Sequence, residues 1–160
     1  LRMRPDRVVV GEIRDGYAAM DMLQAMNTGH EGSMGTVHAN SPRDCFTRID
    51  GMVAIAGMKI DQQAVYSQVA SALDLIVYQT RMRDGSRAVT HIVEITGMEG
   101  SVISMQDIFV RPAHAEGASD PLRAAGLIPN CYQKIIDSGQ TIDRGMFLLP
   151  DEVGSANRWR

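Results

Sequence analysis

Two side chains near the start of the chain have the chemistry of a phosphate-transfer site. Glu12 follows residues 7–10, of which the last three are valines, and such a run predicts a buried β-strand. His38 ends a second short stretch, residues 36–38, that also predicts a strand. In open parallel α/β sheets, ligands bind at the carboxyl ends of the strands. A carboxylate placed there can hold the waters of Mg²⁺ or orient an attacking water, and an imidazole can donate to a phosphate oxygen.

Each of these residues also has an ordinary structural explanation. A carboxylate after a buried strand can lie in a surface turn, and a lone histidine is more often a satisfied core residue than a ligand. His30 follows a predicted helix and can simply complement its dipole. Glycines at positions 29, 32 and 35 indicate a loop that can approach a ligand closely. Two patterns occur in one chain: a carboxylate after a valine-rich strand, and a histidine after a glycine-rich loop. Their joint presence favours the catalytic interpretation of Glu12 and His38.

Residues 1–15, LRMRPDRVVVGEIRD, resemble the Walker B signature of the bacterial type II/type IV secretion (GspE/PilT-like) ATPases. The family pattern is an aliphatic residue and Arg-x-x-Pro-Asp, then an apolar strand, then Gly-Glu-x-Arg-Asp. Its specified positions here are Leu1, Arg2, Pro5, Asp6, Val8, Val9, Val10, Gly11, Glu12, Arg14 and Asp15. Residues 27–40 are similar to the histidine box of the same family, through Thr28, Gly29, His30, Thr36, His38 and Asn40.

The resemblance implies ATP and Mg²⁺ as cofactors and assigns roles to the matched positions. Glu12 is expected to be the catalytic carboxylate, acting on water or on Mg²⁺ through water. His38 is expected to be the second catalytic residue, contacting or sensing the γ-phosphate. Support for the nucleotide and Mg²⁺ site is expected from Gly11, Arg14, Asp15, His30 and Thr36.

Several arginines leave two interpretations open. Arg14, with Asp15, can contact a neighbouring subunit or form an internal salt bridge. A further cluster flanks a predicted turn, where a solvated hairpin and a subunit interface are the alternatives; its members are Arg81, Arg83 and Arg87.

Four stretches, MLQAMNTGHEGS, HANSPRD, RMRDGSRAVTHIVEITGMEG and QDIF, look most like the CpaF/TadA branch, the ATPases of tight-adherence (Flp-type) pili. This resemblance implies part of a hexameric motor that couples ATP hydrolysis to pilin assembly or retraction. Its expected partners are further copies of itself and an inner-membrane platform protein. The expected location is the bacterial cytoplasm, peripheral at the inner membrane. The alternatives are a motor for DNA or effector-protein export, and a non-hydrolysing module for oligomerisation or partner docking.

The phosphate loop, Gly-x-x-x-x-Gly-Lys-Ser/Thr, does not occur within the 160 residues. Without the backbone amides and lysine of that loop, little holds the β- and γ-phosphates. We therefore expect the chain by itself neither to hydrolyse ATP nor to bind it tightly. A sheet without its remaining strands also exposes an edge and an apolar face, so we expect self-association or instability in isolation.

Composition limits the classes of partner. The chain has 44% apolar and 22% charged residues, a net charge of −3 and a pI of about 5.8. It has no general basic surface, so we expect no nucleic-acid partner. No apolar run reaches the roughly 18 residues of a membrane-spanning helix. Cys45 and Cys131 lack Cys-x-x-Cys spacing, so no metal held directly by Cys and His is expected.

Periodicity and capping residues predict the elements that position these side chains. Apolar residues at i, i+3, i+4 and i+7 predict a helix over residues 16–27 that stops before Gly29. Ser41 and Pro42 predict the start of a second helix, and Asp61 the start of a third. The predicted ends of these two helices are at residues 54 or 56 and at residue 73. The predicted strands and turns lie at residues 75–80, 83–87 (turn), 88–96, 97–100 (turn) and 101–110.

With the family resemblance, these elements imply an α/β fold: the C-terminal part of a RecA-like P-loop ATPase core, with parallel strands, flanking helices and an antiparallel hairpin. We place the C-terminal half of the ATPase domain at residues 1–111 and a second segment at 112–160. The second segment is predicted to hold a flexible linker, at least one helix within residues 121–138 that is broken near Gly126 and Pro129, and a frayed tail over residues 150–160.

Overall fold

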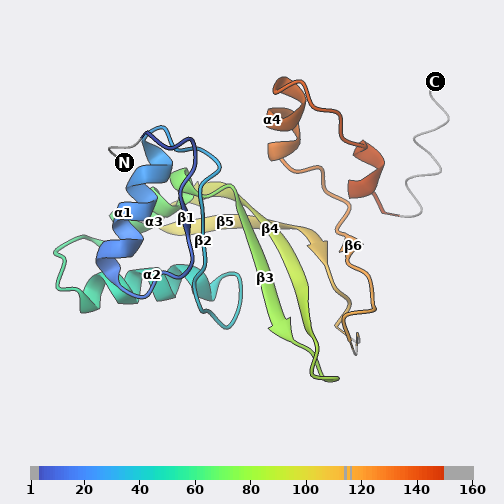
Figure 1. Cartoon of the computed structure of the whole chain (residues 1–160), viewed down its shortest axis with the longest axis horizontal. Coiled ribbons are helices and arrows are strands. Elements are labelled where there is room, and N and C mark those ends of the chain that lie inside the picture. The colour runs from blue at the N-terminus through green and yellow to red at the C-terminus, as the bar shows by residue number, and fades with distance from the viewer. Residues whose placement is uncertain (1–3, 114, 116, 150–160) are drawn as a thin grey trace. The chain divides into compact units, whose positions relative to one another are not determined.

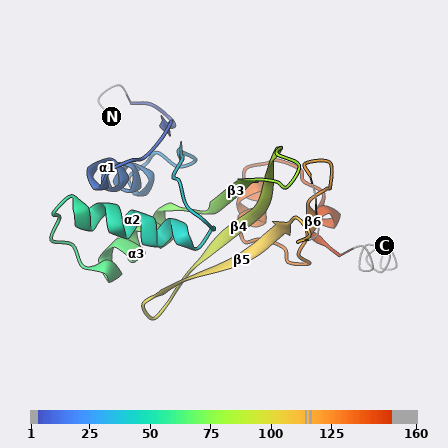
Figure 2. The ribbon, with the colours of Figure 1, turned by 90° about the horizontal axis from the view of Figure 1, so that it is seen from below.

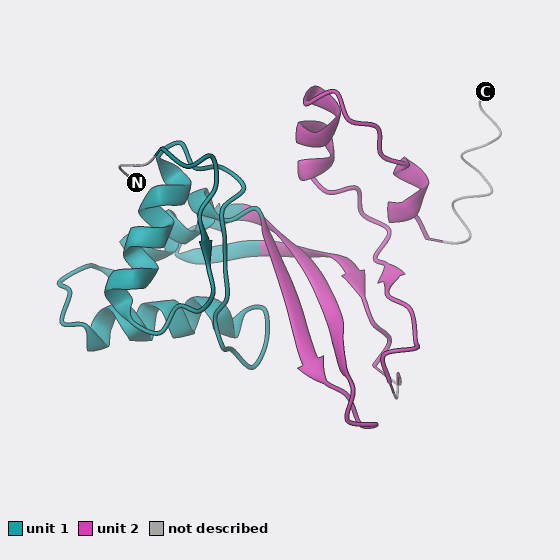
Figure 3. Cartoon of the chain, in the orientation of Figure 1, with its two compact units in different colours: residues 1–74, 97–104 teal, residues 75–96, 105–160 magenta. Residues whose placement is uncertain are grey.

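The computed structural model describes residues 4–113, 115 and 117–149. They form an α/β structure (Figure 1) with two compact units (Figure 3). The first unit lies within residues 1–74 and 97–104, and the second within residues 75–96 and 105–160. The predicted division between residues 111 and 112 stays a prediction. Several predicted features lie outside the described residues: the motif positions Leu1 and Arg2, the linker residue His114 and the tail with Trp159.

The helix predicted over residues 16–27 is confirmed as α1, Gly16–Asn27. Ala19, Met22 and Leu23 are 1%, 4% and 3% exposed, so the predicted apolar stripe is the buried face of the helix. Gly29 follows the C-cap with φ at +89°, a left-handed conformation that glycine adopts without steric cost. Gly29 therefore ends the helix as the sequence indicates.

The second helix, α2, spans Asp44–Ile55. Its predicted cap is present, since the hydroxyl of Ser41 accepts a hydrogen bond from the amide of Asp44 at 3.0 Å. The helix begins after the predicted Pro42, because residues 42–43 form a turn before the regular helical ladder starts. Its predicted end before Gly57 is confirmed.

The third helix, α3, spans Gln62–Ala72 and is capped as predicted by Asp61, which accepts from the amide of Gln63 at 3.1 Å. All three helices contact one another within the first unit (Figure 2). The rings of Phe46 and Tyr66 meet edge to face, with centroids 6.5 Å apart. α1 and α2 have 12 residues each, and no helix in the described ranges could cross a bilayer.

The contact of α1 with α2 depends on the absence of a side chain at Gly16. A Cβ atom there would lie 2.5 Å from the carbonyl oxygen of Met52 and 2.7 Å from the Cα of Val53. We expect Gly16→Ala to lower the free energy of unfolding by about 1–3 kcal/mol, since backbone atoms must move to admit the methyl group. Chemical denaturation measures this change. Gly51→Ala on α2 is the control, since nothing lies within 4 Å of its Cβ position. There we expect stabilisation of about 0.5–1 kcal/mol from helix propensity.

The predicted parallel strands are present but short. β1, Val9–Val10, pairs in parallel with β2, Met34–Gly35, and the two run side by side in Figure 1. The prediction of a buried first strand is wrong, since Val9 is 69% exposed. Among the described residues β1 has only one neighbouring strand and β2 covers only one edge of it. The second strand was predicted at residues 36–38 but lies earlier, where the Met34 amide donates to the carbonyl of Val8 at 2.9 Å.

A four-stranded antiparallel sheet has the order β3-β4-β5-β6. Its strands are β3 Leu75–Arg81, β4 Arg87–Glu99, β5 Val102–Val110 and β6 Arg123–Ala124. The first three confirm predicted strands. The turn predicted over residues 97–100 is wrong in extent, because β4 continues to Glu99 and only residues 100–101 turn. A two-residue turn suits the twist of the flanking strands, and Gly100 supplies its positive φ.

The stretch over residues 121–138, predicted to hold at least one helix broken near Gly126 and Pro129, is helical after Pro129 but not before Gly126. β6 occupies its start and pairs with the end of β5, with Ala124 opposite Phe109. The helix is confined to α4, Cys131–Asp137, and a 3₁₀ turn, η1, follows at Arg144–Phe147. The edge of β5 pairs with residues 123–124 through backbone hydrogen bonds, and the local spacing of apolar residues cannot predict such long-range pairing.

The linker predicted over residues 112–120 has no helix or strand where it is described, but it is anchored. The guanidinium of Arg111 donates to the carbonyls of Gly117 and Ala118 at 3.4 Å each. The amide of Ala118 donates to the hydroxyl of Ser86 at 3.2 Å. Ala115 is 7% exposed, so this segment is part of the second unit's packing.

Candidate functional site

The structure brings Glu12 and His38 together in the first unit. Each follows one of the two parallel strands at its carboxyl end, as the sequence predicts. Nδ1 of His38 lies 3.0 Å from Oε1 of Glu12, and a guanidinium nitrogen of Arg14 pairs with Oε2. The carboxylate thus has one cationic or hydrogen-bonding partner on each oxygen. Its side chain is 28% exposed, against 84% for His38 and 78% for Arg14.

The backbone beneath this pair is fixed by residues of the two predicted motifs. The hydroxyl of Thr36 donates to the carbonyl of Gly11 at 2.5 Å, and the amide of Ile13 donates to the carbonyl of Thr36 at 2.9 Å. These bonds continue the pairing of β1 with β2 beyond the regular strands. They hold the peptide units on both sides of Glu12 against the segment that leads to His38.

Arg14 sets the protonation of Glu12. The guanidinium of Arg14, which donates to the carboxylate, is the largest cause of the lowered pKa of Glu12; burial opposes it, and the nearby His38 adds the smallest lowering. The same pairing raises the pKa of Arg14. Because the pKa of Glu12 is lowered, the carboxylate stays ionised to a more acidic pH than an isolated glutamate does. Any stability that the ionised Glu12 carboxylate adds to the fold is fully present at pH values above the ordinary pKa of a glutamate. This stability is lost as the pH falls through the lowered pKa of Glu12.

We expect Arg14→Ala to raise the pKa of Glu12 to near its ordinary value, because it removes the largest cause of the shift. His38→Ala should raise that pKa less. A ¹³C NMR titration of the Glu12 carboxyl measures both changes. Arg48→Ala is the control, since Arg48 forms no ion pair or hydrogen bond with Glu12 in the part of the chain that the structure describes. An unchanged titration in Arg14→Ala would contradict the pairing.

The other predicted site residues of the first unit have structural contacts. Oδ1 of Asp15 accepts from the amide of Ala18 at 2.9 Å and so caps α1. The carbonyl of His30 accepts from the hydroxyl of Ser33 at 2.6 Å, which shapes the glycine-rich loop. Nδ1 of His30 is buried and has no hydrogen-bond partner within the described part of the chain. A direct role of Asp15 or His30 toward the nucleotide stays a prediction.

The predicted arginine cluster lies in the second unit, at the turn between β3 and β4. All three side chains are exposed, and Arg81 and Arg87 are opposite one another in the strand register. The turn is ordered by Asp84, whose carboxylate accepts from the hydroxyl and amide of Ser86, and these bonds lower its pKa. This geometry fits a solvated hairpin, and the proposed subunit contact of Arg81, Arg83 and Arg87 stays a prediction.

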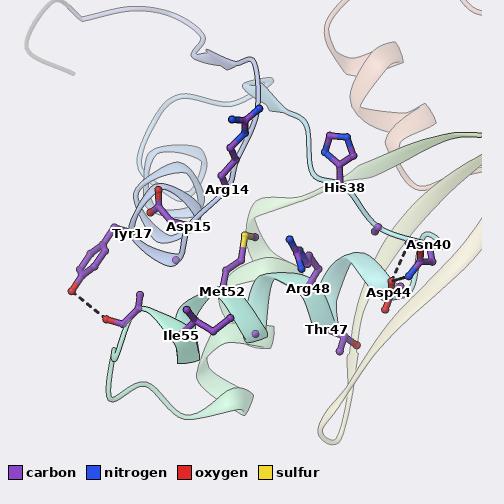
Figure 4. Close-up of a pocket in the computed structure, with 14 residues that line it drawn as sticks. Arg14, Asp15, Tyr17, His38, Asn40, Asp44, Thr47, Arg48, Met52 and Ile55 are labelled. Atoms are coloured by element: carbon purple, nitrogen blue, oxygen red, sulfur yellow. Dashed lines mark hydrogen bonds between the residues drawn. The ribbon is translucent and has the colours of Figure 1, made fainter.

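Sequence reasoning missed a groove next to Glu12. It has a volume of about 850 Å³ and lies between the start of α1, the segment after β2, and α2 (Figure 4). Arg48, Met52 and Ile55 line it from α2. Their i, i+4 and i+7 spacing on the predicted second helix could have indicated a common face.

The two cysteines are not disulfide-bonded. Burial, and secondarily the charge of Asp44, raises the pKa of Cys45 to about 11, so its thiol stays protonated at neutral pH. Among the described residues no three or more His, Cys, Asp or Glu side chains form a metal-binding cluster. Glu12 offers one carboxylate, which fits a Mg²⁺ ion held mainly by water and phosphate oxygens, as is usual for Mg²⁺.

Comparison with known proteins identifies the class of protein to which this chain belongs. The fold resembles that of the VirB11 ATPase of the Brucella suis type IV secretion system, with a TM-score of 0.51 and 26% sequence identity, over 57% of this chain and 29% of that one. The model of the family described as "Type II/IV secretion system protein" matches residues 1–119. The chain belongs to this family.

Relatives in the family are named for conjugation and secretion. A Mycobacterium tuberculosis protein named for conjugal transfer is 45% identical over 102 residues, 64% of this chain and 28% of that protein. The conjugal transfer protein TrbB of Rhizobium radiobacter is 39% identical over 97 residues, covering 61% and 28%. Protein VirB11 of Agrobacterium fabrum is 38% identical over 79 residues, covering 48% and 23%. The chain thus spans less than a third of the length of these relatives.

Proposed function

We propose that the chain carries the Walker B and histidine-box half of an ATPase site in a type IV secretion or conjugal-transfer machine. The observation that carries the proposal is the pairing of Glu12 with His38 and Arg14 at the carboxyl ends of two adjacent parallel strands. A carboxylate kept ionised and partly exposed there can accept a proton from, or orient, the water that attacks a phosphoryl group.

His38 has a distinct role in this proposal. With its Nδ1 on Glu12, its side chain is still 84% exposed, which leaves the other ring nitrogen accessible to a phosphate oxygen. Bound ATP and Mg²⁺ would supply the phosphoryl group and its charge neutralisation. Glu12 would face the Mg²⁺ waters, while Thr36 and Gly11 hold the backbone that positions both side chains.

The whole protein is proposed to act as a homo-hexamer, peripheral at the cytoplasmic face of a bacterial inner membrane, with a membrane platform as its partner. The names of the relatives favour export of DNA or effector proteins over pilin assembly, which reverses the preference drawn from sequence. The pilus branch remains supported only by the stretches quoted from the sequence. A cross-linking experiment in cells that compares pilin with transferred DNA or effector substrates distinguishes these machines.

The test is ATP hydrolysis by this chain beside a version extended N-terminally through a phosphate loop. We expect turnover only in the extended form, because the β- and γ-phosphates need the amides and lysine of that loop. Equal activity in the two forms would contradict the proposal. No activity in either, even with the membrane partner added, would favour a non-hydrolysing docking module.

A further inference from the structure

Two side-chain hydroxyl groups, those of Ser33 and Thr36, lie at opposite ends of the pairing between β1 and β2. The hydroxyl of Ser33 accepts a hydrogen bond from the amide of Val8 at 2.9 Å, just before the first register pair. The hydroxyl of Thr36 donates to the carbonyl of Gly11, just after the last register pair. Each hydroxyl therefore joins the segment that carries β1 to the segment that carries β2.

The hydroxyl of Ser33 takes the place of a backbone carbonyl. Since Val9 is opposite Met34, the same register places Val8 opposite Ser33. A regular parallel ladder there would join the Val8 amide to the Gly32 carbonyl, and the Met34 amide to the Val8 carbonyl. The second of these bonds is present at 2.9 Å. Gly32, however, turns with φ at +75°, and the Val8 amide donates to the Ser33 hydroxyl instead.

A second hydrogen bond fixes the direction of this hydroxyl. Ser33 is half-buried, and its hydroxyl donates to the carbonyl of His30 at 2.6 Å. The same carbonyl accepts from the amide of Ser33 at 3.3 Å. A hydroxyl has one hydrogen to donate, so its oxygen is left to accept from Val8. Both bonds need a hydroxyl, which threonine keeps and alanine and valine lack.

The other features that normally set strand register are weak in this pair. Register is usually specified by the side chains of a buried face, and it is weakly specified in glycine-rich strands. Val9 and Met34, the first register pair, are 69% and 60% exposed. In the second pair, Val10 is opposite Gly35, which has no side chain to pack. Because each strand has only two residues, the two hydroxyl groups contribute a large share of what specifies this register.

We propose that Ser33 is a positioning residue, whose hydroxyl fixes the register of β1 on β2 and so brings His38 to Glu12. A one-residue slip moves a strand by about 3.3 Å and turns its side chains to the opposite face. The 3.0 Å contact between Nδ1 of His38 and Oε1 of Glu12 cannot survive such a slip. Glu12 follows Val8 by four residues, about 13 Å of extended chain, so Ser33 acts without touching the reacting atoms. The register role stands on the ladder alone, whereas its effect on hydrolysis rests on the function proposed for Glu12.

Disulfide formation across the ladder measures the register. Val9→Cys and Met34→Cys place two thiols on exposed register partners, and adjacent strands lie about 4.8 Å apart, within the reach of a disulfide. The pair is introduced into the version extended through a phosphate loop, and the new disulfide is followed by peptide mapping during air oxidation. Adding Ser33→Ala should slow its formation by about tenfold, because two hydrogen bonds that hold the register are lost. Adding Ser33→Thr, which keeps the hydroxyl, should leave the rate within about twofold of the parent.

Hydrolysis by the same extended protein, with Val9 and Met34 in place, measures the consequence for the site. Ser33→Ala should lower kcat by at least about tenfold, since small displacements of catalytic groups are costly. The KM for ATP should stay within about twofold, because Ser33 does not touch the nucleotide. Ser33→Thr should restore kcat.

Two further variants separate the hydroxyl of Ser33 from volume and from general stability. Ser33→Val has the shape of the threonine variant without the hydroxyl, so it should behave as Ser33→Ala does, and it keeps the test open if the smaller variant does not fold. Ser71→Ala removes another hydroxyl of the first unit, one that donates to the side chain of Asn27 at 2.9 Å and joins α3 to α1. It should leave the disulfide rate and kcat within about twofold.

Four results would overturn the proposal. An unchanged disulfide rate in both Ser33→Ala and Ser33→Val would remove the register role, and a slowed rate with unchanged kcat would remove the positioning role. Recovery by Ser33→Val equal to that by Ser33→Thr would assign the effect to volume. Equal losses in Ser71→Ala would assign it to general destabilisation. Failure of the proposed function looks different, because Glu12→Gln would then keep its turnover while the disulfide rates still depend on Ser33.

Discussion

Replacing Glu12 by Gln in a protein that carries both this chain and a phosphate loop should abolish ATP turnover while leaving ATP binding intact. Glutamine keeps the size and one acceptor oxygen of Glu12 but cannot accept a proton from water. Loss of a general base typically costs 10²–10⁴-fold in rate, so we expect a fall in kcat of about that size. Steady-state hydrolysis and equilibrium binding of a fluorescent ATP analogue measure the two effects separately.

The matched control for this substitution is Glu99→Gln, at the exposed end of β4. It removes the same charge from the same chain and should leave kcat within about twofold. Retention of more than roughly a tenth of the wild-type turnover in Glu12→Gln would contradict a general-base role. Loss of ATP binding with turnover would instead assign Glu12 to nucleotide affinity.

The sequence predicts α1, the caps at Ser41 and Asp61, and the placement of Glu12 and His38 at the ends of neighbouring strands. Each depends on residues close together in the chain or on a rule that strand ends meet at one edge of a sheet. An apolar stripe along twelve residues, a cap at the start and a glycine just after the end together specify a helix from local sequence. The chemistry of the site is therefore readable from two short motifs.

Other features depend on long-range contacts that the sequence does not reveal. β6 exists because the edge of β5 is free to pair with Arg123 and Ala124, which have no strand periodicity of their own. Val9 has the composition of a buried residue but is exposed, because burial depends on which strands lie beside it.

Glu94 is the clearest residue that sequence reasoning passed over. It lies on β4 in a stretch of strand composition, yet it is 2% exposed. Its Oε2 accepts from Nε2 of Gln106 at 2.8 Å and from the amide of Asn130 at 2.9 Å, and its Oε1 accepts from the amide of Cys131 at 2.8 Å. The two amides belong to the start of α4, where backbone N–H groups have no partner within the helix. A buried carboxyl group thus holds α4 to the sheet of the second unit.

Glu94→Ala should lower the free energy of unfolding by roughly 1–3 kcal/mol, because it leaves the amides of Asn130 and Cys131 and the Gln106 side chain without their acceptor. Urea denaturation measures the change, and hydrogen exchange should accelerate first at the amides of Asn130 and Cys131. Glu94→Gln should give an intermediate loss, since its one remaining carbonyl oxygen cannot serve both sides while its amide group faces further donors. Glu99→Ala, exposed on the same strand, should stay within about 0.5 kcal/mol of the wild type. If both alanine variants have the same stability, the three hydrogen bonds of Glu94 do not anchor α4, and the aromatic contacts of Phe147 with Phe109 and Tyr132 must hold it instead.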